Sequence, residues 1–145
     1  MALTSKISIG ARVVLGGMFV FSGLNGFLHF APLPPMPAKA GEFIGAMLAT
    51  GYLFPLVKAL EIAAGSLLLA GRFVPLALTV LAPIVVNVVA FHALLAPAGV
   101  AIPLVLLAAE IYLAWTHRAS FAPMLQAKTS AAAAESSPPA RLATI

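Results

Sequence analysis

Long apolar stretches separated by short polar segments dominate the sequence. No charged residue occurs in residues 13–38 or in residues 73–109. The second stretch would form a single helix about 55 Å long, whereas the hydrocarbon core of a bilayer is about 30 Å thick. It must therefore fold back, and residues 97–99 supply the turn, because proline and glycine together end a helix. The pattern predicts four membrane spans, over residues 9–30, 52–70, 73–95 and 100–115.

The connections between these spans differ in composition. Four prolines within residues 32–37 exclude a helix there and indicate a stiff extended segment. Apolar residues recur with helical spacing in residues 39–50, which indicates either a short interfacial helix or an early part of the second span. Residues 71–72, a glycine followed by an arginine, predict a tight turn into the third span.

The composition changes again after residue 118. Residues 119–145 contain stretches rich in Ala, Ser and Pro, and they predict a disordered tail after a short amphipathic piece at residues 121–125. We therefore expect a membrane domain over residues 1–118 and a cytoplasmic tail over residues 119–145.

The amino-acid composition supports a membrane protein. The chain of 145 residues is 62% hydrophobic and 8% charged, against about 25% charged residues in ordinary soluble domains. So few charges exclude a soluble globular protein and a charged disordered chain. The absence of cysteine excludes disulfides, thiolate metal sites and thiol redox chemistry on this chain. The expected fold class is an all-α membrane protein with a bundle of four transmembrane helices.

Basic residues set the expected orientation, because segments rich in Lys and Arg stay in the cytoplasm. With four spans, one side of the membrane holds Lys6, Arg12, Arg72, Arg118, Lys128 and Arg141. The other side holds only Lys39. Both termini are therefore predicted to lie in the cytoplasm, with the chain in the inner membrane of a bacterium. The alternative is a signal peptide cleaved at Ala38-Lys39-Ala40, which would leave three spans.

Five polar residues are predicted to lie at membrane depth, where an unpaired charge is costly. They are Asn25, Lys58, Glu61, Asn87 and Glu110. Counting about 1.5 Å per residue from the cytoplasmic basic residues places Asn25, Lys58 and Asn87 at nearly one height. Lys58 and Glu61 are three residues apart and can pair on one helix face. Two interpretations stay open: a structural ion pair, and a functional polar site that the two asparagines complete.

Glu110 has no cation within four residues on its own helix. It could share a proton with Glu61, pair with Lys58, or hold two helices together as a neutral acid through a hydrogen bond. A role in proton transfer is the functional alternative.

His29 and His92 are predicted to lie near the outer ends of the first and third spans. Two histidines at similar depth could bind a b-type haem, and the alternative is a pair of unligated imidazoles at the interface. A metal site would include more nitrogen or carboxylate ligands nearby, so we expect no metal and favour unligated histidines. We also expect no nucleic acid partner, because the basic residues lie at the membrane edges.

Small residues occur on the first two spans and permit close approach of helices. They are Gly16, Gly17, Ser22, Gly23 and Gly26 on the first span, and Ala59, Ala63, Ala64, Gly65 and Ser66 on the second. We expect these two helices to pack against each other.

Several short motifs occur in order over residues 13–121. They are Pro32-Leu-Pro-Pro-Met-Pro37, Phe43-Ile-Gly-Ala-Met-Leu48, Thr50-Gly-Tyr-Leu-Phe-Pro55, Lys58-Ala-Leu-Glu61, Gly71-Arg-Phe-Val-Pro-Leu-Ala-Leu78, Ala82-Pro-Ile-Val-Val-Asn87 and Phe91-His92. This series resembles the bacterial DoxX family of membrane proteins. The resemblance implies a four-helix membrane fold and a link to membrane-associated redox or oxidative-stress systems.

Three functions are compatible with these features. The first is a small membrane subunit of a redox system that handles quinone or protons. Its pocket would contain Asn25, Lys58, Glu61 and Asn87, and Glu110 would exchange a proton. The second function is a non-enzymatic scaffold that recruits a soluble partner, and the third is a carrier for a small solute. Any of them could involve a homo-oligomer.

Overall fold

The computed structural model describes residues 2–32 and 34–127, and this part is helical with no strand. The main helices are α1 (Ala2–Leu28), α2 (Ala38–Ala49), α3 (Leu53–Ala70), α4 (Val74–Leu95), α5 (Ala101–Thr116) and α6 (Arg118–Phe121). Two short 3-10 helices, η1 (Pro97–Gly99) and η2 (Ala122–Leu125), precede α5 and follow α6. The all-helical class is as predicted.

Three of the described helices are long and apolar enough to cross a membrane. The suitable segments are Ser5–Leu28, Leu53–Ala70 and Val74–Leu95, and α5 is a shorter apolar helix of 16 residues. Together with the composition, these helices fit a membrane-embedded, multi-pass protein. The sequence predicts the first helix from residue 9, whereas α1 begins at Ala2, because nothing before Ile9 interrupts a helix.

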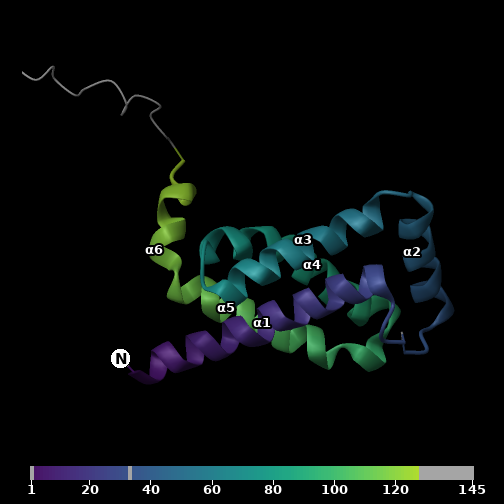
Figure 1. Cartoon of the computed structure of the whole chain (residues 1–145), viewed down its shortest axis with the longest axis horizontal. Coiled ribbons are helices and arrows are strands. Elements are labelled where there is room, and N and C mark those ends of the chain that lie inside the picture. The colour runs from purple at the N-terminus through teal and green to yellow at the C-terminus, as the bar shows by residue number, and fades with distance from the viewer. Residues whose placement is uncertain (1, 33, 128–145) are drawn as a thin grey trace, which may run out of the picture.

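Four helices lie side by side and two shorter ones cross their ends (Figure 1). Helix α1 packs against α3 and α5, and α4 packs against the same two helices. Helices α3 and α5 therefore occupy opposite corners of the bundle. Helix α2 lies across one end, and α6 lies across the other end, where the N-terminus also lies (Figure 1).

The core between these helices is apolar and small. Its largest fully buried side chains are those of Leu15, Leu68, Leu81, Val85 and Leu113. Many large apolar side chains on the outside are exposed, including Val86, Leu94 and Ile111. In water such an apolar exterior would drive association, whereas in lipid it is solvated.

Helix α2 decides between the two expectations for residues 39–50, which were a separate short helix and an early part of the second span. It is a helix separate from α3, because the chain turns at Gly51, whose φ of 73° is in the left-handed region. The hydroxyl of Thr50 stabilises this turn by donating to the carbonyl of Met47 and accepting from the amide of Leu53. At the other end of the chain, helical structure continues through η2, and residues 128–145 of the predicted tail lie outside the described residues.

Helices α1 and α3 approach so closely that several glycines have no room for a side chain. A Cβ atom on Gly16 would lie 2.8 Å from the carbonyl oxygen of Gly65, and a Cβ atom on Gly65 would lie 2.8 Å from that of Gly16. A Cβ atom on Gly23 would lie 2.8 Å from the carbonyl oxygen of Lys58. The predicted packing of these two helices is confirmed, and it places Lys58 directly against α1.

Candidate functional site

Lys58 and Glu61 form an ion pair between α1 and α3. The ammonium nitrogen Nζ of Lys58 lies 3.1 and 2.9 Å from the two carboxylate oxygens of Glu61. It also donates to the hydroxyl oxygen of Ser22 on α1, at 2.9 Å. The ring of Phe54 lies one turn earlier on α3, with its centroid 5.4 Å from Nζ. An ammonium group has three hydrogens, and three acceptor oxygens, two on Glu61 and one on Ser22, lie within hydrogen-bonding distance of Nζ.

The pair is largely closed to its surroundings. The side chain of Glu61 is 3% exposed and that of Lys58 is 16% exposed. The methylene stem of Lys58 crosses α1 at Gly26, where a Cβ atom would lie 2.6 Å from Cγ of Lys58. Burial, mutual neutralisation and hydrogen bonds to the ammonium group are what a structural ion pair requires. Every hydrogen bond of Nζ to the described residues goes to Ser22 or Glu61.

Ser22 is a hydrogen-bond partner of Lys58 that the sequence does not reveal, because there Ser22 stands out only as a small residue that permits close helix packing. Its position four residues before Gly26 places both residues on one face of α1. Lys58 runs along that face, with its stem at Gly26 and its charge at Ser22. A serine one helical turn before a glycine on α1, with a lysine on the neighbouring helix, is the sequence pattern that could have indicated this contact.

The two predicted asparagines do not join this pair. Asn25 instead holds the chain as it leaves α1: its amide nitrogen donates to the carbonyl of Ala31 at 3.1 Å, and its Oδ1 accepts from the amide of Ala31 at 2.7 Å. Asn87 is exposed on α4 and makes no side-chain hydrogen bond to the described residues. The predicted four-residue polar pocket is therefore reduced to Lys58 and Glu61, with Ser22 added.

Glu110 is buried on α5, apart from the ion pair. The residue is 5% exposed, and its Oε1 atom has no hydrogen-bond partner among the described residues. The one ion pair of the described residues is Lys58–Glu61, and both oxygens of Glu61 accept from Lys58. Glu110 therefore forms no ion pair with Lys58.

The two candidate histidines occupy different local environments. His29 is exposed and follows α1 with a left-handed φ of 51°. His92 is half-buried in α4: its Nδ1 lies 2.8 Å from the carbonyl oxygen of Val88, and its ring meets that of Phe91 edge to face. The ring contacts of the described residues include none between the two imidazoles. Residues 2–32 and 34–127 also contain no group of three or more potential metal ligands.

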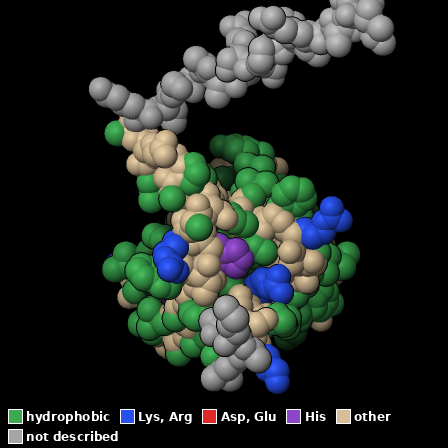
Figure 2. All heavy atoms as spheres, turned by 90° about the vertical axis from the view of Figure 1, so that its left-hand side faces the viewer, with side chains coloured by type: hydrophobic (Ala, Val, Ile, Leu, Met, Phe, Trp, Pro, Cys, Tyr) green, Lys and Arg blue, Asp and Glu red, His purple; other side chains and the backbone are tan. Residues whose placement is uncertain are grey.

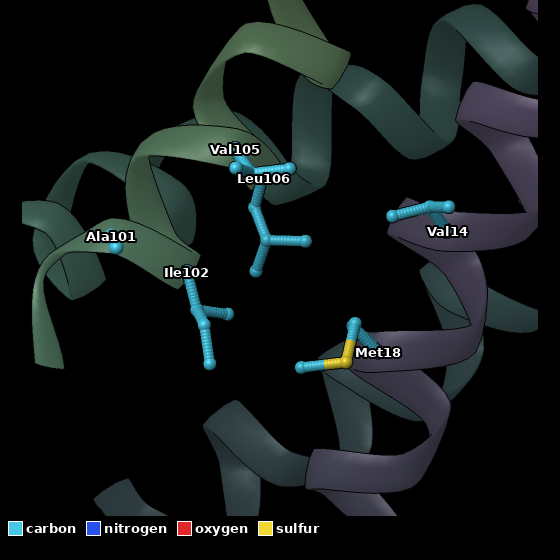
Figure 3. Close-up of a pocket in the computed structure, with 6 residues that line it drawn as sticks. All are labelled: Val14, Met18, Ala101, Ile102, Val105 and Leu106. Carbon is cyan, nitrogen blue, oxygen red and sulfur yellow. The ribbon is translucent and has the colours of Figure 1, made fainter.

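Two grooves open on the surface of the bundle, away from the ion pair. The first has a volume of about 310 Å³ and lies between α1 and α5 (Figure 3). Its lining is wholly apolar and consists of Val14, Met18, Ala101, Ile102, Val105 and Leu106. The second lies where α5 meets α6 and η2. Neither of these two grooves is lined by a predicted site residue.

The chain matches no protein-family model, no curated protein and no solved structure. The likeness to the DoxX family thus rests on the sequence motifs themselves.

Proposed function

We propose that this chain is a small, non-catalytic subunit of a membrane-associated redox system in the bacterial inner membrane, similar to DoxX-family proteins. The redox link comes from the resemblance. The non-catalytic role is supported by the largely buried Lys58–Glu61 pair, in which the ammonium group already contacts three oxygens of the chain. We expect the subunit to anchor and position a cofactor-bearing partner.

In this proposal the chain crosses the membrane four times, with α5 as the fourth span. Sixteen residues give about 24 Å of helix, and bilayers accommodate such a short span by local thinning or by interfacial anchors. Trp115, in the last turn of α5, and Arg118, the first residue of α6, are residues of the interfacial type. The view onto the end that carries the N-terminus shows several Lys and Arg side chains and no Asp or Glu (Figure 2). That distribution supports both termini in the cytoplasm.

Single cysteines provide a test of this topology, because the chain has none of its own. We expect Ala98→Cys, in the turn before α5, to react with a membrane-impermeant maleimide in intact spheroplasts. Ser120→Cys, after α5, should react only once the membrane is permeabilised. Lys39→Cys is the control for the outer side. Equal labelling of positions 98 and 120 in intact spheroplasts would mean that α5 does not cross the membrane.

The subunit role predicts a partner. Purification of the tagged full-length chain in mild detergent from its native membrane is expected to recover a second protein in fixed ratio. That protein should carry a flavin, a haem or an iron–sulfur cluster, and the complex should turn over quinone. The double variant Lys58→Met/Glu61→Leu should retain both the partner and the turnover, since the pair is structural.

Two results would contradict this proposal. One is a Soret band, or stoichiometric quinone, on the isolated chain, because it would make this chain the cofactor-bearing component. The other is loss of quinone turnover in the double variant, or in Glu110→Gln, while the complex stays assembled. Such a loss of turnover would indicate that the replaced polar residues take part in the reaction.

A further inference from the structure

The groove beside α6 differs from the one in Figure 3, because its lining includes a cation. Its volume is about 340 Å³. It is lined by Ile111, Ala114, Trp115, Arg118, Phe121 and Leu125. Five of these side chains are apolar, and the sixth is the guanidinium of Arg118. The groove thus combines an apolar surface with a single positive charge.

The groove lies where α5 meets α6. Ile111, Ala114 and Trp115 lie on α5, which ends at Thr116, and Arg118 begins α6. Helix α6 leaves the end of the bundle sideways (Figure 1), and Phe121 on it packs back against the core. With α5 as the fourth span, as proposed above, Ile111 and Ala114 lie toward the hydrocarbon region and Arg118 lies toward the membrane surface.

Arg118 is held in place and still has donors to offer. Its Nη1 donates to the carbonyl of Trp115 at 3.1 Å, and its guanidinium carbon lies 5.3 Å from the centroid of the Trp115 ring. The single ion pair of the described part is Lys58–Glu61, so Arg118 has no carboxylate partner there. A guanidinium group with five N–H donors, one of them used, is well suited to a phosphate.

We propose that this groove is a binding site for one anionic phospholipid. The phosphate of the lipid binds Arg118, its glycerol lies beside Trp115, and one acyl chain follows Ile111 and Ala114. Charge complementarity selects the occupant, because the visible surface of this end carries Lys and Arg but no Asp or Glu (Figure 2). The groove in Figure 3 has no polar group and selects no headgroup.

Trp115 is the only tryptophan of the chain and lines the groove, so its fluorescence reports on the occupant directly. The full-length protein is reconstituted in phosphatidylcholine vesicles that contain phosphatidylglycerol or phosphatidylcholine with brominated acyl chains. We expect brominated phosphatidylglycerol to bind beside Trp115 about fivefold more tightly than brominated phosphatidylcholine, the gain expected from one basic residue at a membrane surface. In Arg118→Gln the two lipids should quench equally.

Arg72→Gln is the matched control, since Arg72 is an exposed arginine outside the groove, in the turn between α3 and α4. It should keep the fivefold preference for phosphatidylglycerol. Arg118→Lys should keep part of that preference, because lysine retains the charge without the planar fork.

Equal quenching by the two lipids in the unchanged protein would overturn the proposal. An equal loss in Arg72→Gln and Arg118→Gln would overturn it too, because it would indicate a general surface potential. Relief of the quenching by millimolar inorganic phosphate would point to a soluble anion instead of a lipid.

Discussion

Glu61→Leu is expected to lower the free energy of unfolding by about 3–5 kcal/mol, because it leaves the Lys58 ammonium without its carboxylate in an apolar helix interface. In the unchanged protein Nζ of Lys58 lies 2.9 Å from one oxygen of Glu61 and 3.1 Å from the other. The hydroxyl of Ser22 is the one hydrogen-bond acceptor that would remain. The Lys58 side chain is 16% exposed, so partial rehydration places the expected loss toward the lower end of this range.

The double variant Lys58→Met/Glu61→Leu should recover most of that loss. Removing both charges also removes the cost of desolvating them, and apolar replacements of similar size often leave stability unchanged. Methionine retains a flexible apolar stem that can cross Gly26 as the lysine does. The measurement is equilibrium unfolding in dodecyl maltoside micelles by sodium dodecyl sulfate, followed by circular dichroism. A double variant as unstable as Glu61→Leu would show that the pair contributes more than its own neutralisation.

The positions of the helices could be predicted from the sequence, because two physical limits act on every span. A helix in lipid must be apolar and about as long as the hydrocarbon core is thick. These limits place the predicted 73–95 within one residue of α4, and the predicted 52–70 within one residue of α3. The start of α1 at Ala2 was missed, because these limits act on the apolar part of a helix and do not fix where the helix itself begins.

Which residues form the polar site was harder to predict, because the position of a side chain depends both on its height along the helix and on the direction in which it points. Asn25 and Asn87 were placed at the height of Lys58 by counting residues. The direction in which each side chain points changes by about 100° per residue, and it depends on how the helices rotate against one another. Asn87 is exposed on α4. Asn25 binds the backbone of Ala31, a local contact that residue counting does not consider.

The close approach of α1 and α3 connects this packing to the ion pair. Lys58 can reach Ser22 because Gly23 and Gly26 bring the two backbones together on that face. The sequence indicated which two helices would pack, since both carry small residues. It could not indicate which glycines face the partner helix, and adjacent Gly16 and Gly17 illustrate the difference. Only Gly16 contacts α3, whereas a Cβ atom on Gly17 would meet nothing within 4 Å.

Gly16→Ala is therefore expected to destabilise the protein by about 1–3 kcal/mol, which is typical of an overpacked interface. The new methyl group would lie 2.8 Å from the carbonyl oxygen of Gly65 and 3.1 Å from Cβ of Leu68. Because the nearest atom belongs to the backbone, no rotation of a side chain can relieve the contact, and α1 must move away from α3. The higher helix propensity of alanine, worth up to about 1 kcal/mol, offsets part of this cost.

Gly17→Ala is the matched control, one residue away on the same helix. It gains the same helix propensity without a steric contact, so its stability should be unchanged or higher by up to about 1 kcal/mol. Both variants are measured by the detergent titration used for Glu61→Leu. If they respond alike, close packing is not the reason for glycine at position 16.

If only Gly16→Ala is destabilised, the separation of α1 from α3 should also lengthen the contact between Ser22 and Lys58. The glycine contact and the ion pair would then be coupled, and combining Gly16→Ala with Glu61→Leu should cost less than the sum of the two single losses.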